Sequence, residues 1–183
     1  MKVHLPTGTL TGVPWLRSPN CDDRPPGVEP ELIVIHNISL PPGEFGGYWI
    51  KALFTNQLDP GIHPYFTEIY QLKVSAHLLI QRDGTLTQFV PFHKRAWHAG
   101  DSCYRDKKDC NDFSIGIELE GTDTVGYEPV QYQRLVESVR ALVAAYPTLS
   151  REAITGHEHI SPRRKTDPGP AFDWGLFASM LRH

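Results

Sequence analysis

The pattern of apolar positions predicts strands in four segments. An unbroken, largely β-branched run at 32–35 is typical of a strand buried on both faces. At 113–121, isoleucine and leucine alternate with a glycine and two glutamates, which predicts a strand with one apolar face. Two runs at 74–80 and 86–90 flank an Asp-Gly turn and predict a β-hairpin.

Other segments show the one-sided apolar spacing of amphipathic helices. The clearest runs from 127 to 146, where Pro129 suits the first helical position. A second helix is predicted at 48–58, and Asp173 is placed to N-cap a last short helix. The mixed segment 63–71 is compatible with one more short helix.

The remaining segments predict loops. Residues 1–28 hold several prolines and glycines and predict an irregular N-terminal arm. The stretch 91–112 lacks clear periodicity, and loops of that length often bind ligands or act as lids. The stretch 156–169 contains two prolines and two glycines, which argue against a regular helix or a central strand. A polar loop restrained by proline is well suited to holding chemical groups in place.

Length and charge narrow the class of protein. With 183 residues the chain predicts a single domain, 1–183, with room for a sizeable core. The net charge of −3 gives no field that would attract nucleic acid or an acidic membrane. Because Met1–Asp23 lacks the apolar core of a signal peptide and no membrane span is visible, we expect a cytoplasmic protein. The odd cysteine count favours reduced thiols, with a Cys103–Cys110 bridge left open.

Candidate metal ligands gather after the strand at 32–35 and in the loop 156–169. His36 follows the strand, at the kind of position where ligands gather in open α/β sheets, while His157 and Asp167 lie in the loop. Two imidazoles and a carboxylate form a zinc set that leaves a fourth position for water. Alone, His36 would be better explained as a hydrogen-bonded core histidine. Beside this loop, we predict one Zn²⁺ bound by His36, His157 and Asp167.

Glu118 and Lys165 are the candidate catalytic residues. A carboxylate near a metal in a partly dry cleft suits a general base, and Gly116 leaves room beside Glu118. Lys165 lies two residues before Asp167 and would stabilise an oxyanion. With zinc to activate water, these roles describe amide or ester hydrolysis. For His77, within a predicted strand, packing is slightly favoured over a supporting role behind the metal ligands.

Four long segments carry a specific resemblance to a known family. They are VIHNISLPPGEFGG at 34–47, RAWHAG at 95–100, CNDFSIGIELEGTDT at 110–124 and RKTDPG at 164–169. They resemble the AmpD family of cytoplasmic 1,6-anhydro-N-acetylmuramyl-L-alanine amidases, within the wider zinc amidase and peptidoglycan-recognition fold. The resemblance extends from about Gly12 to Phe177 and so covers nearly the whole chain.

The resemblance implies an α/β fold: a single domain with a central mixed β-sheet, flanking helices and long loops around a zinc groove. It implies cleavage of the amide bond between (1,6-anhydro-)N-acetylmuramic acid and L-alanine of muropeptides in peptidoglycan recycling. It carries the zinc roles onto His36, His157 and Asp167, and the catalytic roles onto Glu118 and Lys165. In organisms with an inducible β-lactamase, such an enzyme represses it indirectly by destroying the muropeptide inducer.

The resemblance also implies that several residues contact the substrate: Asn37, Tyr65, Lys73, Trp97 and the loop 105–109. Lys73 and Asp109 depart from the arginines that family members often carry there. Because Lys is a point charge and Asp repels a carboxylate, Lys107 and Lys108 become candidates to bind the peptide carboxylates. His159 stands where an acidic residue is usual, and we do not expect it to compete as a ligand.

Two other functions are weighed against hydrolysis. A non-catalytic module that binds or senses peptidoglycan fragments would be indicated by loss of a metal ligand or of the base, and none is lost. An amidase acting on intact cell wall outside the cytoplasm would need an export signal. We expect a monomer that binds an anhydro-muropeptide, with no nucleic-acid or membrane partner. The preference for anhydro over ordinary muramic acid stays open.

Overall fold

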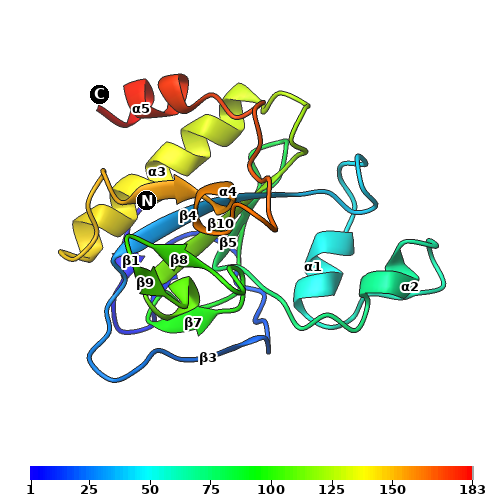
Figure 1. Cartoon of the computed structure of the whole chain (residues 1–183), viewed down its shortest axis with the longest axis horizontal. Coiled ribbons are helices and arrows are strands. Elements are labelled where there is room, and N and C mark those ends of the chain that lie inside the picture. The colour runs from blue at the N-terminus through cyan, green and yellow to red at the C-terminus, as the bar shows by residue number, and fades with distance from the viewer. Residues whose placement is uncertain (183) are drawn as a thin grey trace.

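The centre of the protein is a mixed five-stranded sheet with the strand order β11-β4-β10-β5-β6 (Figure 1). The computed structural model describes residues 1–182. Three pairings in the sheet are parallel, and only the pairing of β5 with β6 is antiparallel. This confirms the predicted α/β fold with a mixed sheet. The sheet strands are β4 (Leu32–Ile38), β5 (Leu78–Ile80), β6 (Leu86–Gln88), β10 (Ser114–Glu120) and β11 (Ile154–Gly156).

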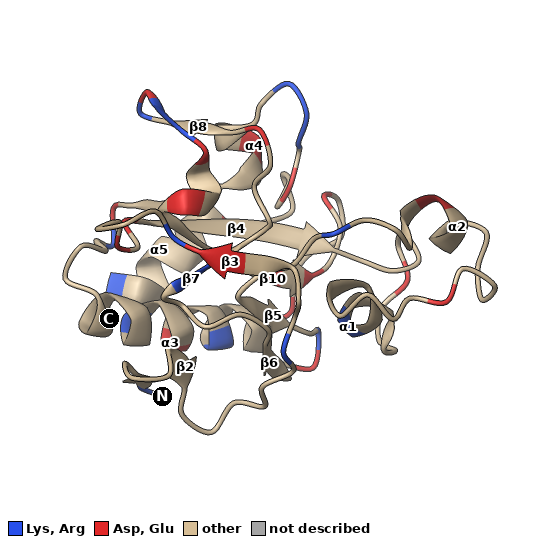
Figure 2. Cartoon of the chain, turned by 90° about the horizontal axis from the view of Figure 1, so that it is seen from below, with Lys and Arg blue, Asp and Glu red and all other residues tan. Residues whose placement is uncertain are grey.

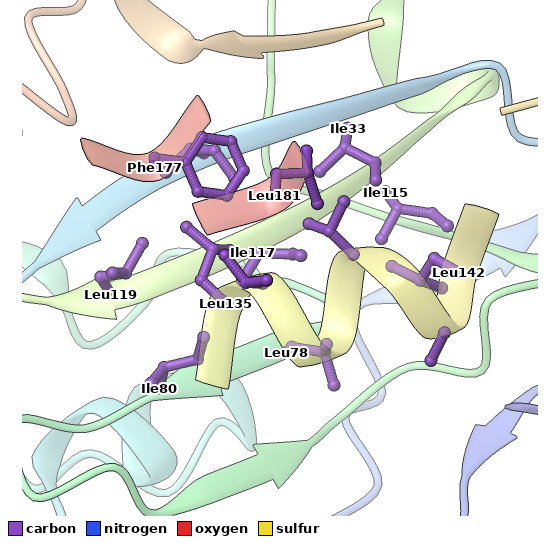
Figure 3. Packing of buried hydrophobic residues seen from close by; sticks show 14 of the residues in the cluster. Ile33, Leu78, Ile80, Ile115, Ile117, Leu119, Leu135, Leu142, Phe177 and Leu181 are labelled. Atoms are coloured by element: carbon purple, nitrogen blue, oxygen red, sulfur yellow. The ribbon is translucent and has the colours of Figure 1, made fainter. Parts of the chain in front are cut away.

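One face of the sheet is covered by the helices α3 (Pro129–Ala145) and α5 (Trp174–Arg182) (Figure 1). Leu135 and Leu142 of α3 are completely buried and pack with side chains of β4, β5, β10 and α5. Figure 3 shows these side chains meeting between the sheet and the helices. Asp173 caps α5 as predicted, because its Oδ1 accepts a hydrogen bond from the backbone N of Leu176 at 2.8 Å.

Two short helices, α1 (Trp49–Phe54) and α2 (Phe66–Ile69), extend to one side of the sheet (Figure 1). Their buried side chains form a second apolar cluster with Leu79 of β5. The helix predicted at 48–58 is shorter than expected. It ends at Phe54 because Asn56 adopts a left-handed conformation with φ of 60°, which a continuing helix cannot contain.

Strand β10 is buried along its whole length, so the face that carries its glutamates is covered as well as the apolar face. Glu120 shows how this is tolerated. Its Oε1 accepts a hydrogen bond from Gly46 N at 2.6 Å, and its Oε2 accepts one from Arg82 N at 3.1 Å. Both carboxylate oxygens are therefore satisfied by backbone donors, and Glu120 acts as a structural residue.

Segments predicted to be irregular contain short ordered elements. In the arm 1–28, β1 (Val3–His4) pairs with β2 (Thr9–Leu10), and β3 (Cys21–Asp23) pairs with β7 (Lys94–Ala96). Such two- and three-residue ladders are too short to produce a periodic sequence pattern. The stretch 91–112 also holds β8 (Cys103–Tyr104), β9 (Lys107–Lys108) and a 3₁₀ turn at Cys110–Asp112.

The polar loop contains one helical turn, α4 (His157–Ile160), so the exclusion of helix from this stretch was wrong at its start. The turn ends before Pro162, and the restriction that proline imposes therefore begins only after it.

None of the three cysteines forms a disulfide. Within residues 1–182, every helix is too short or too polar to cross a bilayer. Basic and acidic residues are both scattered over the molecule (Figure 2), in keeping with its small net charge.

Candidate metal centre and active site

Three predicted ligands converge in the structure. His36 Nδ1 lies 3.0 Å from His157 Nδ1 and 3.0 Å from Asp167 Oδ2, and the last two atoms are 3.1 Å apart. No other group of three or more His, Cys, Asp or Glu residues in the described chain forms such a cluster. Both imidazoles are almost fully buried.

The sheet explains why residues so distant in sequence meet. β4 and β11 are neighbouring parallel strands, and Gly156, the last residue of β11, pairs with Ile35, so His157 lies next to His36 at this edge of the sheet. The prediction that the strand ends before His36 was wrong, because β4 continues to Ile38 and His36 pairs within it. Asp167 is brought back beside them because its backbone oxygen accepts a hydrogen bond from Glu158 N at 2.9 Å. The cluster therefore depends on one strand pairing and one loop contact.

In each imidazole, the hydrogen bond of the ring nitrogen outside the cluster decides whether the nitrogen inside the cluster carries a proton. His157 Nε2 lies 3.0 Å from the carbonyl oxygen of Ala99, which only accepts hydrogen bonds, so this nitrogen carries the proton. Nδ1 of His157 then points an unprotonated lone pair into the cluster.

The spacing of the three ligand atoms can be compared with that around zinc. Tetrahedral zinc bound at about 2.0–2.1 Å holds its ligand atoms about 3.3 Å apart. The observed spacing of 3.0–3.1 Å fits a cation of this size.

The protonation states of the cluster suit a metal. Burial lowers the pKa of His36 to about 4, which keeps the ring neutral near pH 7. Burial alone would raise the pKa of Asp167, but the His157 and His36 rings next to its Oδ2 hold this pKa well below its ordinary range. Two neutral imidazoles and an ionised carboxylate are the forms that ligate zinc.

Glu118 lies beside the cluster on the neighbouring strand. It pairs in register with His36 across β10 and β4, so both side chains emerge on the same face of the sheet. Its Oε2 is buried and has no hydrogen-bond partner among the described residues. Burial, reinforced by the charge of Asp167, raises the pKa of Glu118 well above its ordinary value. A carboxyl group with a spare oxygen and a raised pKa has the properties of a proton acceptor.

These side chains line one groove of about 360 Å³. Lys165 lies in its wall and forms no ion pair within residues 1–182, so its ammonium can act on a ligand. Tyr65 and Trp97 also line the groove. The Trp97 ring is fixed by its Nε1, which donates a hydrogen bond to Asp22 Oδ1 at 3.1 Å.

Asn37 lines the groove too, but its amide has a structural task. Its Nδ2 donates hydrogen bonds to Asp123 Oδ1 at 2.8 Å and to Pro168 O at 3.0 Å. These contacts hold the turn that carries Asp167. Only the remaining surface of Asn37 is available to a ligand.

Three predicted substrate contacts are not brought to this groove. Lys73 is exposed and does not line it. Lys107 and Lys108 lie on β9, where Lys107 binds Glu31 Oε2 at 2.9 Å and borders a different cavity. Lys107 also lies 4.1 Å from the ring centroid of Phe113. The structure thus places these three lysines away from this groove, and their contact with substrate stays a prediction.

Two further histidines lie outside the cluster. His77 is completely buried; its Nδ1 accepts a hydrogen bond from Gly116 N at 3.0 Å and its Nε2 lies 3.1 Å from Lys94 O. These hydrogen bonds join β10 to β7, and neither of them reaches a ligand of the cluster. His159 is exposed, and its nearest acidic partner is Glu158 at 3.8 Å.

The sequence reasoning missed His98. Its Nδ1 lies 2.9 Å from His36 Nε2, and it lines the same groove. Burial lowers the pKa of His98 well below its ordinary value. A histidine inside the segment RAWHAG was the available signal, but nothing in the sequence placed that segment against His36.

Comparison with known proteins identifies the family of the chain. The profile of the family described as N-acetylmuramoyl-L-alanine amidase matches residues 26–170. The chain is 59% identical to the 1,6-anhydro-N-acetylmuramyl-L-alanine amidase AmpD of Escherichia coli K12, over 97% of this chain and 96% of that protein. It is 48% identical to AmpD of Haemophilus influenzae, over 96% of this chain and 95% of that protein.

Solved structures give the same result. A crystal structure of a selenomethionine AmpD derivative superposes with a TM-score of 0.95 at 55% identity, covering 99% of both chains. The Escherichia coli amidase AmiD, in complex with anhydro-N-acetylmuramic acid-L-Ala-D-γ-Glu-L-Lys, gives a TM-score of 0.60 at 28% identity, covering 86% of this chain and 60% of that chain. The chain belongs to the N-acetylmuramoyl-L-alanine amidase family, within its AmpD branch.

Proposed function

We propose that this protein is a zinc-dependent amidase that cleaves the bond between (1,6-anhydro-)N-acetylmuramic acid and L-alanine in recycled muropeptides. The observation that carries the proposal is the meeting of His36 Nδ1, His157 Nδ1 and Asp167 Oδ2 in a groove that also holds Glu118 and Lys165. The full-length similarity to AmpD proteins supports the choice of substrate. We further propose that the enzyme acts as a cytoplasmic monomer.

A zinc ion held by the three side chains would polarise the amide carbonyl and make water a stronger acid. Glu118 takes a proton from the attacking water and passes it to the amine of the departing L-alanine. Lys165 stabilises the negative charge that develops on the carbonyl oxygen. The C–N bond breaks, leaving a carboxylate on the lactyl group and a free amino terminus on the peptide.

The walls of the groove place the substrate for this reaction. Trp97 and Tyr65 offer aromatic surface for the sugar or for the first peptide residues. The orientation of Trp97 is set before binding by its hydrogen bond to Asp22. Because Lys107 borders another cavity, we do not assign the peptide carboxylates to it.

Incubation with purified muropeptides tests this function. We expect mass spectrometry of the products to show a muramic-acid sugar with a free lactyl carboxylate and an intact peptide that begins with L-alanine. Parallel assays with anhydro and ordinary muramyl peptides show which sugar is preferred. Substrate that stays intact with zinc-loaded protein would favour the non-catalytic binding module instead.

Replacing Asp167 with alanine should weaken zinc binding. The substitution removes the one anionic ligand, so a chelator should extract the metal at a lower concentration than from the wild type. Asp101→Ala at an exposed aspartate is the matched control and should retain zinc like the wild type. Zinc affinity that is unchanged in Asp167→Ala would remove Asp167 from the ligand set.

A further inference from the structure

The imidazole of His98 makes contacts that the proposed hydrolysis does not use. Its Nδ1 lies 2.9 Å from His36 Nε2, and its Nε2 lies 3.1 Å from Ser114 Oγ. The rings of His36 and His98 meet edge to face with centroids 4.9 Å apart. His98 therefore contacts His36 through the ring nitrogen that is not in the three-atom cluster.

Metal binding decides which of the two ring nitrogens donates the hydrogen bond in this contact. When His36 binds a cation through Nδ1, its proton sits on Nε2 and is donated to His98 Nδ1. His98 must then carry its own proton on Nε2, where Ser114 Oγ accepts it. With a cation on Nδ1, the chain from His36 through His98 to Ser114 therefore gives every ring N–H an acceptor and supports the tautomer of His36 that directs a free Nδ1 lone pair into the cluster.

The surrounding structure is shaped to hold the His98 ring. Asn111 Oδ1 accepts hydrogen bonds from the backbone N of His98 at 3.1 Å and of Ala99 at 2.8 Å. Gly116 provides the space for the ring, since a Cβ at that position would lie 2.5 Å from His98 Cγ and 2.7 Å from its Nδ1. The room that Gly116 leaves is therefore taken by His98.

The same short segment supports the second imidazole. The carbonyl oxygen of Ala99, next to His98, accepts the hydrogen bond of His157 Nε2. Asn111, by fixing the backbone at both residues, holds the outer partners of both histidine ligands. This agreement of contacts argues that the segment 98–99 serves the cluster and is not merely packed beside it.

We propose that His98 is a positioning residue that fixes the protonated nitrogen and the ring orientation of His36 in the metal centre. The inference rests on the zinc site of the proposed function and adds a residue to it. Mutating the hydrogen-bond partner of a ligating histidine typically lowers metal affinity by about 10–100-fold. The effect should appear in zinc affinity itself, before any substrate is added.

The variants His98→Leu and His98→Asn form a matched pair. Their side chains have nearly the same shape, but only asparagine offers an oxygen close to the position of Nδ1. We expect His98→Leu to bind zinc about 10–100-fold more weakly than the wild type in competition with a chromogenic chelator. His98→Asn should recover most of this loss. Because both variants lose the volume of the imidazole ring, the thermal unfolding temperature of the zinc-free protein should fall by a similar amount in the two.

Two further variants keep the test independent of folding. Ser114→Ala leaves the His98 ring in place and removes its acceptor, so zinc affinity should fall in the same direction by a smaller factor. His159→Gln removes an exposed imidazole two residues from His157 and should bind zinc like the wild type. Wild-type zinc affinity in His98→Leu, or equal losses in the Leu and Asn variants, would overturn the positioning role alone. Wild-type protein that binds no zinc would overturn the metal centre as well.

Discussion

Glu118→Gln should keep its zinc and lose most of its turnover. A positioned general base typically contributes about 10²–10⁴-fold to a rate, and glutamine has the size of glutamate but cannot accept the proton. Within residues 1–182 the buried Oε2 of Glu118 has no hydrogen-bond partner, so it is not committed to a structural contact, and burial raises the pKa of this carboxyl group. We therefore expect kcat to fall by about two to four orders of magnitude, measured at saturating zinc and substrate.

The same substitution elsewhere provides the control. Glu68→Gln changes an exposed glutamate of α2 and should leave kcat at the wild-type value. Zinc content, measured on the same samples, separates loss of the base from loss of the metal. A Glu118→Gln enzyme with near-normal kcat and full zinc would show that another group accepts the proton.

Lys165→Met should produce the second large effect. Removing one group that stabilises an oxyanion typically lowers kcat by about 10²–10³-fold. Methionine keeps much of the apolar stem and removes the ammonium, so the packing of the groove wall should be unchanged. We expect the loss in kcat and little change in KM, because the negative charge on the carbonyl oxygen develops only as the reaction proceeds.

Lys165→Arg separates charge from geometry. It keeps a positive charge but spreads it over a planar group, so we expect partial activity between that of the wild type and of Lys165→Met. A loss confined to KM in Lys165→Met would indicate that the ammonium binds the ground state of the substrate and has no role in the chemical step.

The parts of the fold that follow local rules could be predicted from the sequence. The β-branched run of β4 favours a strand, and the Asp-Gly pair between β5 and β6 favours a tight turn. Both are present in the structure. The ends of elements were less accurate. The one-turn helix α4 was missed because four residues are too few to show a helical period.

The site was predictable only in part, for a physical reason. The residue types of His36, His157 and Asp167 indicate zinc, and the apolar run before His36 indicates a buried strand beside the site. The strand was expected to end before His36, but it continues to Ile38. The role of His98 depends on how the 91–112 segment crosses the sheet, and the position of Lys107 depends on the β8–β9 pairing. Such long-range placements follow from tertiary packing, which a local pattern does not encode.

The most direct test of the account is the metal content and activity of one preparation. Purified protein should contain one zinc per chain by elemental analysis. Prolonged dialysis against a chelator should remove the zinc and the amidase activity together, and added zinc should restore both. Full activity in protein from which the metal has been removed would contradict the claim that His36, His157 and Asp167 hold the ion on which hydrolysis depends.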